Sequence, residues 1–167
     1  SPVREYSETY KKLRFNIRYS QNVKREEIFV NLVKKYKPKK IVDAGCGAGW
    51  LSNTIAYHYK CSVTGIDFNP VAVERAKAVA NKLNLQVDFS EQDLFLYQPQ
   101  TRFELVVSMR VLLRTNNCRA GLLHLASKWV AKGRHIFVGL YHSYGRAPFL
   151  NHFRRLKENG YSEKDLL

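Results

Sequence analysis

Three glycines on alternate positions constrain the fold of this chain more than any other feature. The stretch VDAGCGAGW, residues 42–50, places Gly45, Gly47 and Gly49 directly after a hydrophobic run that ends in an aspartate. Residues without a Cβ adopt positive φ readily and let a ligand lie against the backbone. In open parallel sheets, the first turn from strand to helix forms the floor of the ligand site. The stretch therefore predicts such a turn, with a ligand resting on it.

The pattern around this turn alternates short hydrophobic runs with segments of helical periodicity. It predicts strands over residues 40–45, 62–67, 86–93, 103–109 and 135–141, and helices over residues 23–36, 50–59, 70–83, 119–132 and 147–160. Asn69 before Pro70 is typical of a helix start, and Gly133 of a helix end. Strands that alternate with helices favour a parallel sheet. We therefore predict an α/β fold, a Rossmann-like parallel sheet with helices on both faces.

The composition supports one domain with a substantial core, because 45% of the 167 residues are hydrophobic. The net charge of +14 favours an acidic partner such as nucleic acid, although scattered lysines also simply keep a protein soluble. Cys46, Cys61 and Cys118 match neither a disulfide framework nor a CxxC metal site, so we expect a reducing compartment and no metal. No apolar run reaches the ~20 residues that cross a bilayer, which favours a cytoplasmic protein.

The spacing of the glycines indicates which ligand the turn accepts. A dinucleotide fingerprint, GxGxxG, has a small third residue, and here Trp50 occupies that position. Asp43, two residues before the first glycine, would repel a pyrophosphate but suits a cationic amino group. Asp67, at the end of the second predicted strand, could accept both hydroxyls of a ribose. These features fit a ligand with a ribose, an adenine and a positively charged amino acid, such as S-adenosylmethionine.

Four segments in chain order carry a family resemblance: IVDAGCGAGW, VTGIDFNP, SEQDLF and FELVVSMRVL. On these segments the chain resembles the class I S-adenosylmethionine-dependent methyltransferases, and in particular the branch that includes quinone-biosynthesis and related small-molecule methyltransferases. The resemblance covers about residues 38–145. It implies S-adenosylmethionine as the cofactor and methyl transfer as the reaction.

The resemblance also implies a set of cofactor-binding residues: Asp43, Gly45, Cys46, Gly47, Asp67, Phe68, Asp93, Leu94 and Met109. In this assignment Asp43 and the glycine turn line the methionine end, Asp67 binds the ribose and Phe68 packs on the adenine. Asp93 and Leu94 read the adenine edge. Taken alone, Asp43 could instead cap the next helix, and Asp93 could be an ordinary loop carboxylate.

The segment RVLLRT departs from the family pattern, because many relatives carry a small residue and a pair of histidines there. Arg110 and Arg114 of this segment, together with Tyr144, form the predicted acceptor-binding set. The two guanidinium groups suit an acidic or phosphorylated acceptor, which they would bind through planar, charge-assisted hydrogen bonds. The alternative is that both arginines are solvent-exposed on a helical turn.

The segment GLYHSYGR, which follows the fifth predicted strand, supplies candidates for a catalytic base. An acceptor atom of high pKa needs a group that takes its proton, and Tyr141 and His142 follow the strand at the active edge of the sheet. Histidines in loops also commonly just meet solvent. Most of the catalysis implied by the resemblance is alignment of the acceptor with the S–CH₃ bond and exclusion of water.

We predict two parts for the chain, an N-terminal helical cap segment at residues 1–37 and an S-adenosylmethionine-binding Rossmann-like methyltransferase domain at residues 38–167. The family sheet has seven strands, whereas this pattern gives five and lacks the final antiparallel hairpin. Either the domain is truncated at its C-terminal end and the natural protein continues, or a partner completes the edge, or the edge stays open. An open edge invites oligomerisation.

The function predicted from these features is S-adenosylmethionine-dependent methyl transfer to a small-molecule or RNA acceptor, which is anionic if the arginines bind it. Two alternatives remain at this point. An aminopropyltransferase-like enzyme would use decarboxylated S-adenosylmethionine and would favour extra acidic residues around its polyamine, which this basic chain lacks. A non-catalytic relative would bind the cofactor or a partner without transferring a methyl group, and the altered RVLLRT segment is compatible with that.

Overall fold

The computed structural model describes residues 23–59, 61–140, 151, 154–155 and 158–160. In chain order its elements are α2 (Val23–Tyr36), β1 (Lys40–Ala44), α3 (Trp50–His58), β2 (Ser62–Asp67), α4 (Pro70–Lys82), β3 (Val87–Glu91), β4 (Phe103–Met109), the 3₁₀ helix η1 (Leu112–Arg114), α5 (Cys118–Lys128) and β5 (Val130–Gly139). Residues 151, 154, 155 and 158 are helical, within the helix predicted over residues 147–160. The predicted alternation of strands and helices is confirmed.

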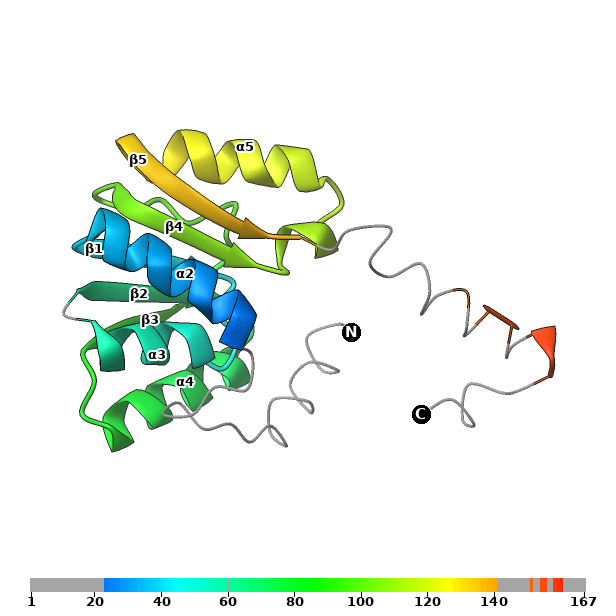
Figure 1. Ribbon diagram of the computed structural model, residues 1–167, viewed down its shortest axis with the longest axis horizontal. Coiled ribbons are helices and arrows are strands. Elements are labelled where there is room, and N and C mark those ends of the chain that lie inside the picture. Colours follow the sequence, from blue (N-terminus) through cyan, green and yellow to red (C-terminus); the bar gives the residue numbers. More distant parts are fainter. Residues whose placement is uncertain (1–22, 60, 141–150, 152–153, 156–157, 161–167) are drawn as a thin grey trace.

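The five strands form one parallel sheet in the order β3-β2-β1-β4-β5 (Figure 1). β1 lies in the centre, where Ile41 is level with Val63 of β2 on one side and with Leu105 of β4 on the other. The chain builds outward from β1 in one direction and then in the other, which creates a crevice at the carboxyl ends of β1 and β4. The parallel α/β fold is therefore confirmed. The predicted lack of a final hairpin concerns residues after β5, most of which lie outside the described residues.

Helices cover both faces of the sheet, as predicted, because consecutive strand residues point to opposite sides. On one face α5 closes a core that contains Val42, Val106 and Trp129. On the other face α2 and α3 close a core around Ile41 and Val107. In Figure 1, α2, α3 and α4 lie together on this second face, and α5 lies behind the sheet.

The helix α2 belongs to the same core as the sheet. Its buried side chains Phe29 and Val33 lie one helical turn apart, and the Phe29 ring contacts the ring of Phe137 in β5 at a centroid distance of 5.7 Å. The boundary between a cap segment at residues 1–37 and a domain at residues 38–167 stays a prediction. No helix within the described ranges is both long and apolar enough to span a bilayer.

The start of α4 agrees with its sequence signals. The side chain of Asn69 accepts hydrogen bonds from the backbone N–H groups of Val71 and Ala72, at 3.0 and 3.2 Å, and Pro70 is the first helical residue. These contacts satisfy two of the backbone donors that a helix start leaves unpaired. The N-cap predicted at Asn69 is confirmed, and it also fixes the chain directly after Asp67.

The end of α5 differs from the sequence prediction. A helix over residues 119–132 ended by Gly133 is wrong, because α5 ends at Lys128 and β5 begins at Val130. Val130 pairs with Phe103, whereas Leu105 pairs with His135, so residues 131–134 bulge out of the ladder. Gly133 lies in this bulge with φ 72°. Burial of Trp129 and pairing of Val130 with β4 therefore end the helix one turn early.

Candidate active site

A cavity of about 650 Å³ lies at the carboxyl ends of β1, β2 and β4, at the crevice of the sheet. Its lining residues are Asp43, Gly45, Cys46, Gly47, Ala48, Trp50, Leu51, Asp67, Phe68, Asn69, Asp93, Leu94, Phe95, Met109, Arg110, Val111, Arg114 and Thr115. These include every residue of the predicted cofactor-binding set, together with both predicted arginines. The structure thus brings them together, while their individual roles stay predictions.

The glycine turn adopts the predicted conformation. At two of its glycines, neighbouring protein atoms rather than a ligand leave no room for a side chain. Gly45, Gly47 and Gly49 have φ values of 82°, 54° and 73°. A Cβ on Gly45 would lie 2.2 Å from a methyl carbon of Val111, and one on Gly49 would lie 2.6 Å from the Cβ of Ala76. Only a bare backbone fits at these two positions. The expectation that a ligand explains all three glycines is therefore too simple.

Asp67 ties the glycine turn to the end of β2. Its carboxylate, 6% exposed, accepts hydrogen bonds from the backbone N–H groups of Gly47 at 2.8 Å and Asn69 at 2.9 Å. Burial raises the pKa of this carboxyl group, and the backbone hydrogen bonds partly oppose that effect. Because a carboxylate offers about four acceptor positions, it can still accept hydroxyl donors from the cavity. Asp67 therefore supports the turn and keeps acceptor positions for a ligand, while its binding role stays a prediction.

Asp43 is the second buried carboxyl group of the site, and its side chain is 3% exposed. Its carboxylate accepts a hydrogen bond from the Ser52 hydroxyl at 2.8 Å. Burial raises the pKa of Asp43 to about 6, the Ser52 hydrogen bond opposes this, and the charge of Asp67 adds to it. A cation placed in the cavity would favour the charged form. The pair of acidic groups therefore suits a ligand with a positive charge.

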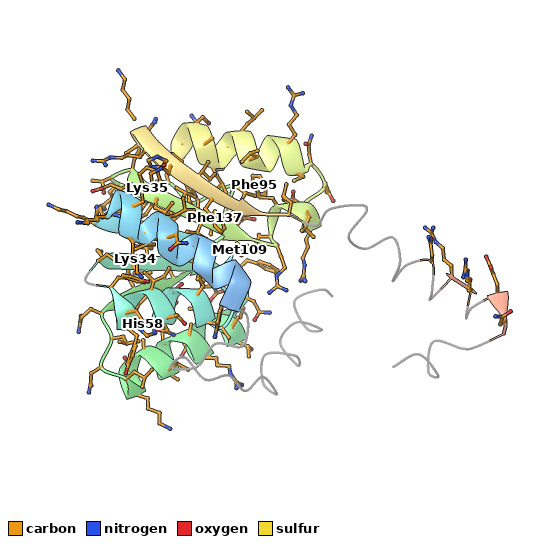
Figure 2. All side chains as sticks on the ribbon, in the orientation of Figure 1. Lys34, Lys35, His58, Phe95, Met109 and Phe137 are labelled. Carbon is orange, nitrogen blue, oxygen red and sulfur yellow. The ribbon has the colours of Figure 1, made fainter. Side chains whose placement is uncertain are left out.

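Aromatic rings form the apolar part of the lining. Phe68 follows Asp67 with half of its side chain exposed, and Phe95 is 45% exposed in the loop after β3 (Figure 2). The Asp93 carboxylate accepts a hydrogen bond from the Phe95 N–H at 2.7 Å, which holds this loop in a tight turn. The carbonyl oxygen of Leu94 lies 3.1 Å from Nε2 of His124. Exposed rings at a cavity favour a flat, apolar ligand group such as a nucleobase.

The segment RVLLRT closes the cavity on the side of β4. Arg110 has φ 62°, which is rare for a residue with a Cβ, and its N–H donates to the carbonyl oxygen of Gly139 at 2.8 Å. Val111 then packs on Gly45, and η1 follows up to Arg114. Backbone strain of this kind is concentrated at functional sites. The path of this segment places Arg110 and Arg114 on the cavity wall.

Sequence reasoning missed several lining residues: Ala48, Trp50, Leu51, Asn69, Phe95, Val111 and Thr115. Most of them adjoin predicted residues in the same turns, so the motif neighbourhoods were a usable signal. The predicted catalytic residues Tyr141 and His142, and the predicted acceptor-binding residue Tyr144, lie outside the described residues. Within the described residues, no group of three or more His, Cys, Asp or Glu is arranged to hold a metal ion.

The donor and acceptor groups of the cavity fit the cofactor implied by the sequence resemblance. Asp67 can accept from ribose hydroxyls, Asp43 can pair with an ammonium group, and Phe68 offers a ring face to adenine. Burial, assisted by the negative charge of Asp43, raises the pKa of the Cys46 thiol, so this wall of the turn stays neutral. The chemistry of the residues therefore matches the three recognisable parts of that ligand.

Comparison with known proteins gives a consistent result. A family model described as a methyltransferase domain matches residues 41–133. The 24-methylenesterol C-methyltransferase 3 of Arabidopsis thaliana is 47% identical over 60 residues, which cover 36% of this chain and 17% of that protein. The mitochondrial ubiquinone biosynthesis O-methyltransferase of Schizosaccharomyces pombe is 35% identical over 102 residues, which cover 59% of this chain and 37% of that protein. This chain thus spans well under half the length of either relative.

Among solved structures, the magnesium protoporphyrin IX methyltransferase of Synechocystis PCC 6803 has a similar fold. It superposes with a TM-score of 0.72 at 20% sequence identity, over 99% of this chain and 81% of that chain. An N-methyltransferase of Bradyrhizobium japonicum superposes with a TM-score of 0.63 at 20% identity, over 83% and 72% of the two chains. These similarities support the Rossmann-like fold.

Proposed function

The chain belongs to the methyltransferase domain family, and we propose that it transfers a methyl group from S-adenosylmethionine to an acceptor held at the carboxyl edge of the sheet. The observation that carries this proposal is the pair of buried carboxylates, Asp43 and Asp67, on neighbouring strands beside the glycine turn. One suits the ammonium group of the cofactor, and the other suits its ribose. A pyrophosphate-containing dinucleotide would meet the negative charge of Asp43 beside the glycine turn and is disfavoured.

The cofactor, when bound, supplies a methyl group made electrophilic by the neighbouring sulfonium. The contribution of the protein is then alignment and exclusion of water. Asp43 and Asp67 would hold the two polar ends of the cofactor, and Phe68 would cover the adenine. Val111, which packs on Gly45, would keep the turn closed. The base that takes a proton from the acceptor stays assigned to His142 or Tyr141 as a proposal.

The acceptor we propose is a small molecule with an anionic group, bound by Arg110 and Arg114. Two facts support it: both arginines belong to the cavity lining, and the named relatives carry out C- or O-methylation in sterol and ubiquinone chemistry. The three free cysteines support a reducing, cytoplasmic compartment. RNA as the acceptor is an outcome of the experiment below.

Titration calorimetry tests cofactor binding. S-adenosylmethionine and S-adenosylhomocysteine should each bind more tightly than NAD, because the site lacks the pyrophosphate-binding spacing. Binding of NAD without either sulfur ligand would overturn the assignment of the turn.

Methyl transfer itself is tested with labelled cofactor and a cell extract that is divided into small-molecule, lipid, RNA and protein fractions. Label in the small-molecule or lipid fraction supports the proposed acceptor class. Label in RNA would replace that class. Cofactor binding without label in any fraction would show a non-catalytic relative.

A further inference from the structure

The amino-terminal edge of the sheet, opposite the cavity, gathers exposed cations. We call this surface the basic edge, and its residues are Lys34, Lys35, Lys37, Lys39, Lys40, Lys82, Arg102, Lys128, Lys132 and Arg134. They come from the last turns of three helices, the loop before β1, the first residue of β1, the residue before β4 and the bulge in β5. Figure 2 shows Lys34 and Lys35 toward the left and Met109 of the cavity toward the right, near opposite ends of the strands.

Side-chain contacts join several parts of the basic edge to one another. The rings of Tyr36 and His135 stack at a centroid distance of 3.8 Å, which brings the end of α2 to the bulge in β5. Arg134 pairs with Glu104 at 3.7 Å, and the Lys40 ammonium donates to the Thr101 hydroxyl. Among the described residues, the first two positions of the strands place two acidic side chains at this edge, Asp88 in β3 and Glu104 in β4. The described residues at the amino ends of the strands therefore carry a large excess of positive charge.

Helix polarity explains part of this charge but not all of it. Lys35, Lys82 and Lys128 occupy last turns, where a cation is favoured by the helix dipole. Lys39 lies in a loop and Lys132 in a bulge, so no helix dipole favours a cation at these two positions. The excess is a property of the surface rather than of the individual helices.

A groove of about 730 Å³ opens on the same edge, between the end of α3 and the turn before β3. It shares Lys39 with the basic edge, and its other lining includes Tyr57, His58, Asn84 and Gln86. The Tyr57 side chain is 40% exposed and meets the His58 ring edge-on at 4.9 Å. The groove therefore offers an aromatic ring and two amide side chains beside the exposed lysines of the basic edge.

We propose that the basic edge and this groove bind a single-stranded polynucleotide. Lysines contact successive phosphates, an exposed ring stacks on a base, and amide groups hydrogen-bond a base edge. A lipid surface fits less well, because the large exposed hydrophobic side chains at this edge are Tyr36 and Tyr57, while Phe68, Phe95 and Leu140 belong to the opposite end of the strands. The five residues of β1 separate the groove from the cavity by about 15 Å. This site is thus distinct from the methyl-transfer site and goes beyond the proposed function.

Fluorescence anisotropy with a labelled, unstructured RNA of about 20 nucleotides tests the proposal, with the matching DNA strand as a second probe. Binding should weaken with salt, by about 0.7 log units in affinity per log unit of salt for each phosphate contact. The slope of log affinity against log salt should be smaller in magnitude by about 1.4 in the double variant Lys39→Gln/Lys132→Gln, which loses two phosphate contacts. The matched control Lys77→Gln/Arg119→Gln removes the same charge elsewhere and should leave the slope unchanged.

The stacking contact has its own test. Tyr57→Ala should weaken RNA binding by about five- to 150-fold, whereas Tyr57→Phe keeps the ring and should retain most of it. Because Tyr57 is 40% exposed, Tyr57→Phe should melt at the parent's temperature and Tyr57→Ala somewhat below it, so binding is compared at a temperature where both variants are folded. Equal binding by the two variants would remove the ring from the site.

Three results would overturn the proposal as a whole. The first is no binding of either strand at low salt, and the second is an equal loss in the edge variant and its control. The third is binding to phosphatidylserine-containing vesicles with none to either strand, which would reassign the surface to a membrane. Calorimetry with S-adenosylmethionine on the same preparations keeps this outcome separate from failure of the proposed function.

Discussion

The two ends of the strands in this sheet hold their charged side chains in different environments. At the carboxyl edge Asp43 and Asp67 are buried, hydrogen-bonded and raised in pKa. At the amino edge the charges are cations, and they are exposed. In a parallel sheet with crossover helices, helix starts gather at the first edge and helix ends at the second. The comparison teaches that helix ends favour cations at the amino ends of the strands, while burial decides whether a charge binds one ligand tightly or a long partner loosely.

The largest expected effect is a change in stability at two glycines with similar φ. Gly45 lies at the carboxyl ends of the strands, and Gly133 lies in the bulge of β5. Gly45→Ala should lower the free energy of unfolding by about 2 to 5 kcal/mol, because it adds a Cβ in the left-handed region and drives it into Val111. Gly133→Ala meets nothing within 4 Å and should cost only about 1 to 2 kcal/mol. Urea denaturation measures both.

The double variant Gly45→Ala/Val111→Ala sharpens this test. Shortening Val111 relieves the collision but not the strain in φ, so the loss due to Gly45→Ala should be smaller in a Val111→Ala background. An equal loss in both backgrounds would show that the contact with Val111 is unimportant.

The next effect is the dependence of stability on pH. The pKa of Asp43 is about 6 in the folded protein, above the unfolded value of 3.8, so its contribution to stability is fully present below about pH 4 and is lost as pH rises to about 6. The loss is up to about 3 kcal/mol. Asp43→Asn should therefore be more stable than the parent at neutral pH and bind S-adenosylmethionine more weakly. Denaturation at several pH values measures the difference.

Asp67, whose pKa is also raised, should leave a residual slope in the Asp43→Asn variant, with stability again falling as pH rises. If the curves of parent and variant run parallel between about pH 4 and pH 7, Asp43 does not titrate in this range and contributes nothing to the pH dependence of stability.

A smaller effect is expected at Asp67. Asp67→Ala should weaken cofactor binding by about 1 to 3 kcal/mol, the usual cost of leaving hydrogen-bonding groups unpaired. It should also destabilise the turn, because the N–H groups of Gly47 and Asn69 lose their acceptor. Calorimetry under conditions where the variant is folded separates the two effects. Unchanged affinity there would place the ligand elsewhere.

The smallest effect is expected for the arginines of the cavity wall. Arg110→Ala/Arg114→Ala should raise KM for an anionic acceptor several-fold, about 1 kcal/mol, and leave cofactor affinity nearly unchanged. The salt dependence of KM should become shallower in the variant. Identical methylation of a fractionated extract by parent and variant, at low and high salt, would show that the arginines are solvated surface. RNA binding at the basic edge should stay as in the parent.

Much of the fold could be predicted, because its signals are local. The bounds of β2 and β4 agree with the hydrophobic runs, and Asn69 marks the start of α4. The end of α5 could not be predicted in this way, because it depends on the pairing of Val130 with Phe103, which lies far away in sequence. A glycine that resembles a helix stop is instead part of a bulge, since tertiary pairing overrides the local preference.

In the candidate site, too, the residues with local sequence signals could be predicted, and the contacts between distant segments could not. Asp43, Asp67 and the glycine turn were predictable, because each adjoins a strand end where parallel sheets place ligands. The contact of Val111 with Gly45 was not, since it joins the first motif to a segment after β4. Phe95 was missed although it ends the segment SEQDLF, because only Asp93 and Leu94 of that segment were assigned to the cofactor.

The bulge in β5 also bears on how copies of this chain meet. An exposed edge strand is a template on which a foreign strand can extend the sheet, and repeated extension leads to aggregates. In β5 the regular ladder covers only His135–Gly139, because residues 131–134 project from it with Lys132 and Arg134 exposed. An incoming strand would find five regular positions and then a cationic kink. Among the described residues β5 is an edge strand, and the bulge makes it a poor template for further sheet growth.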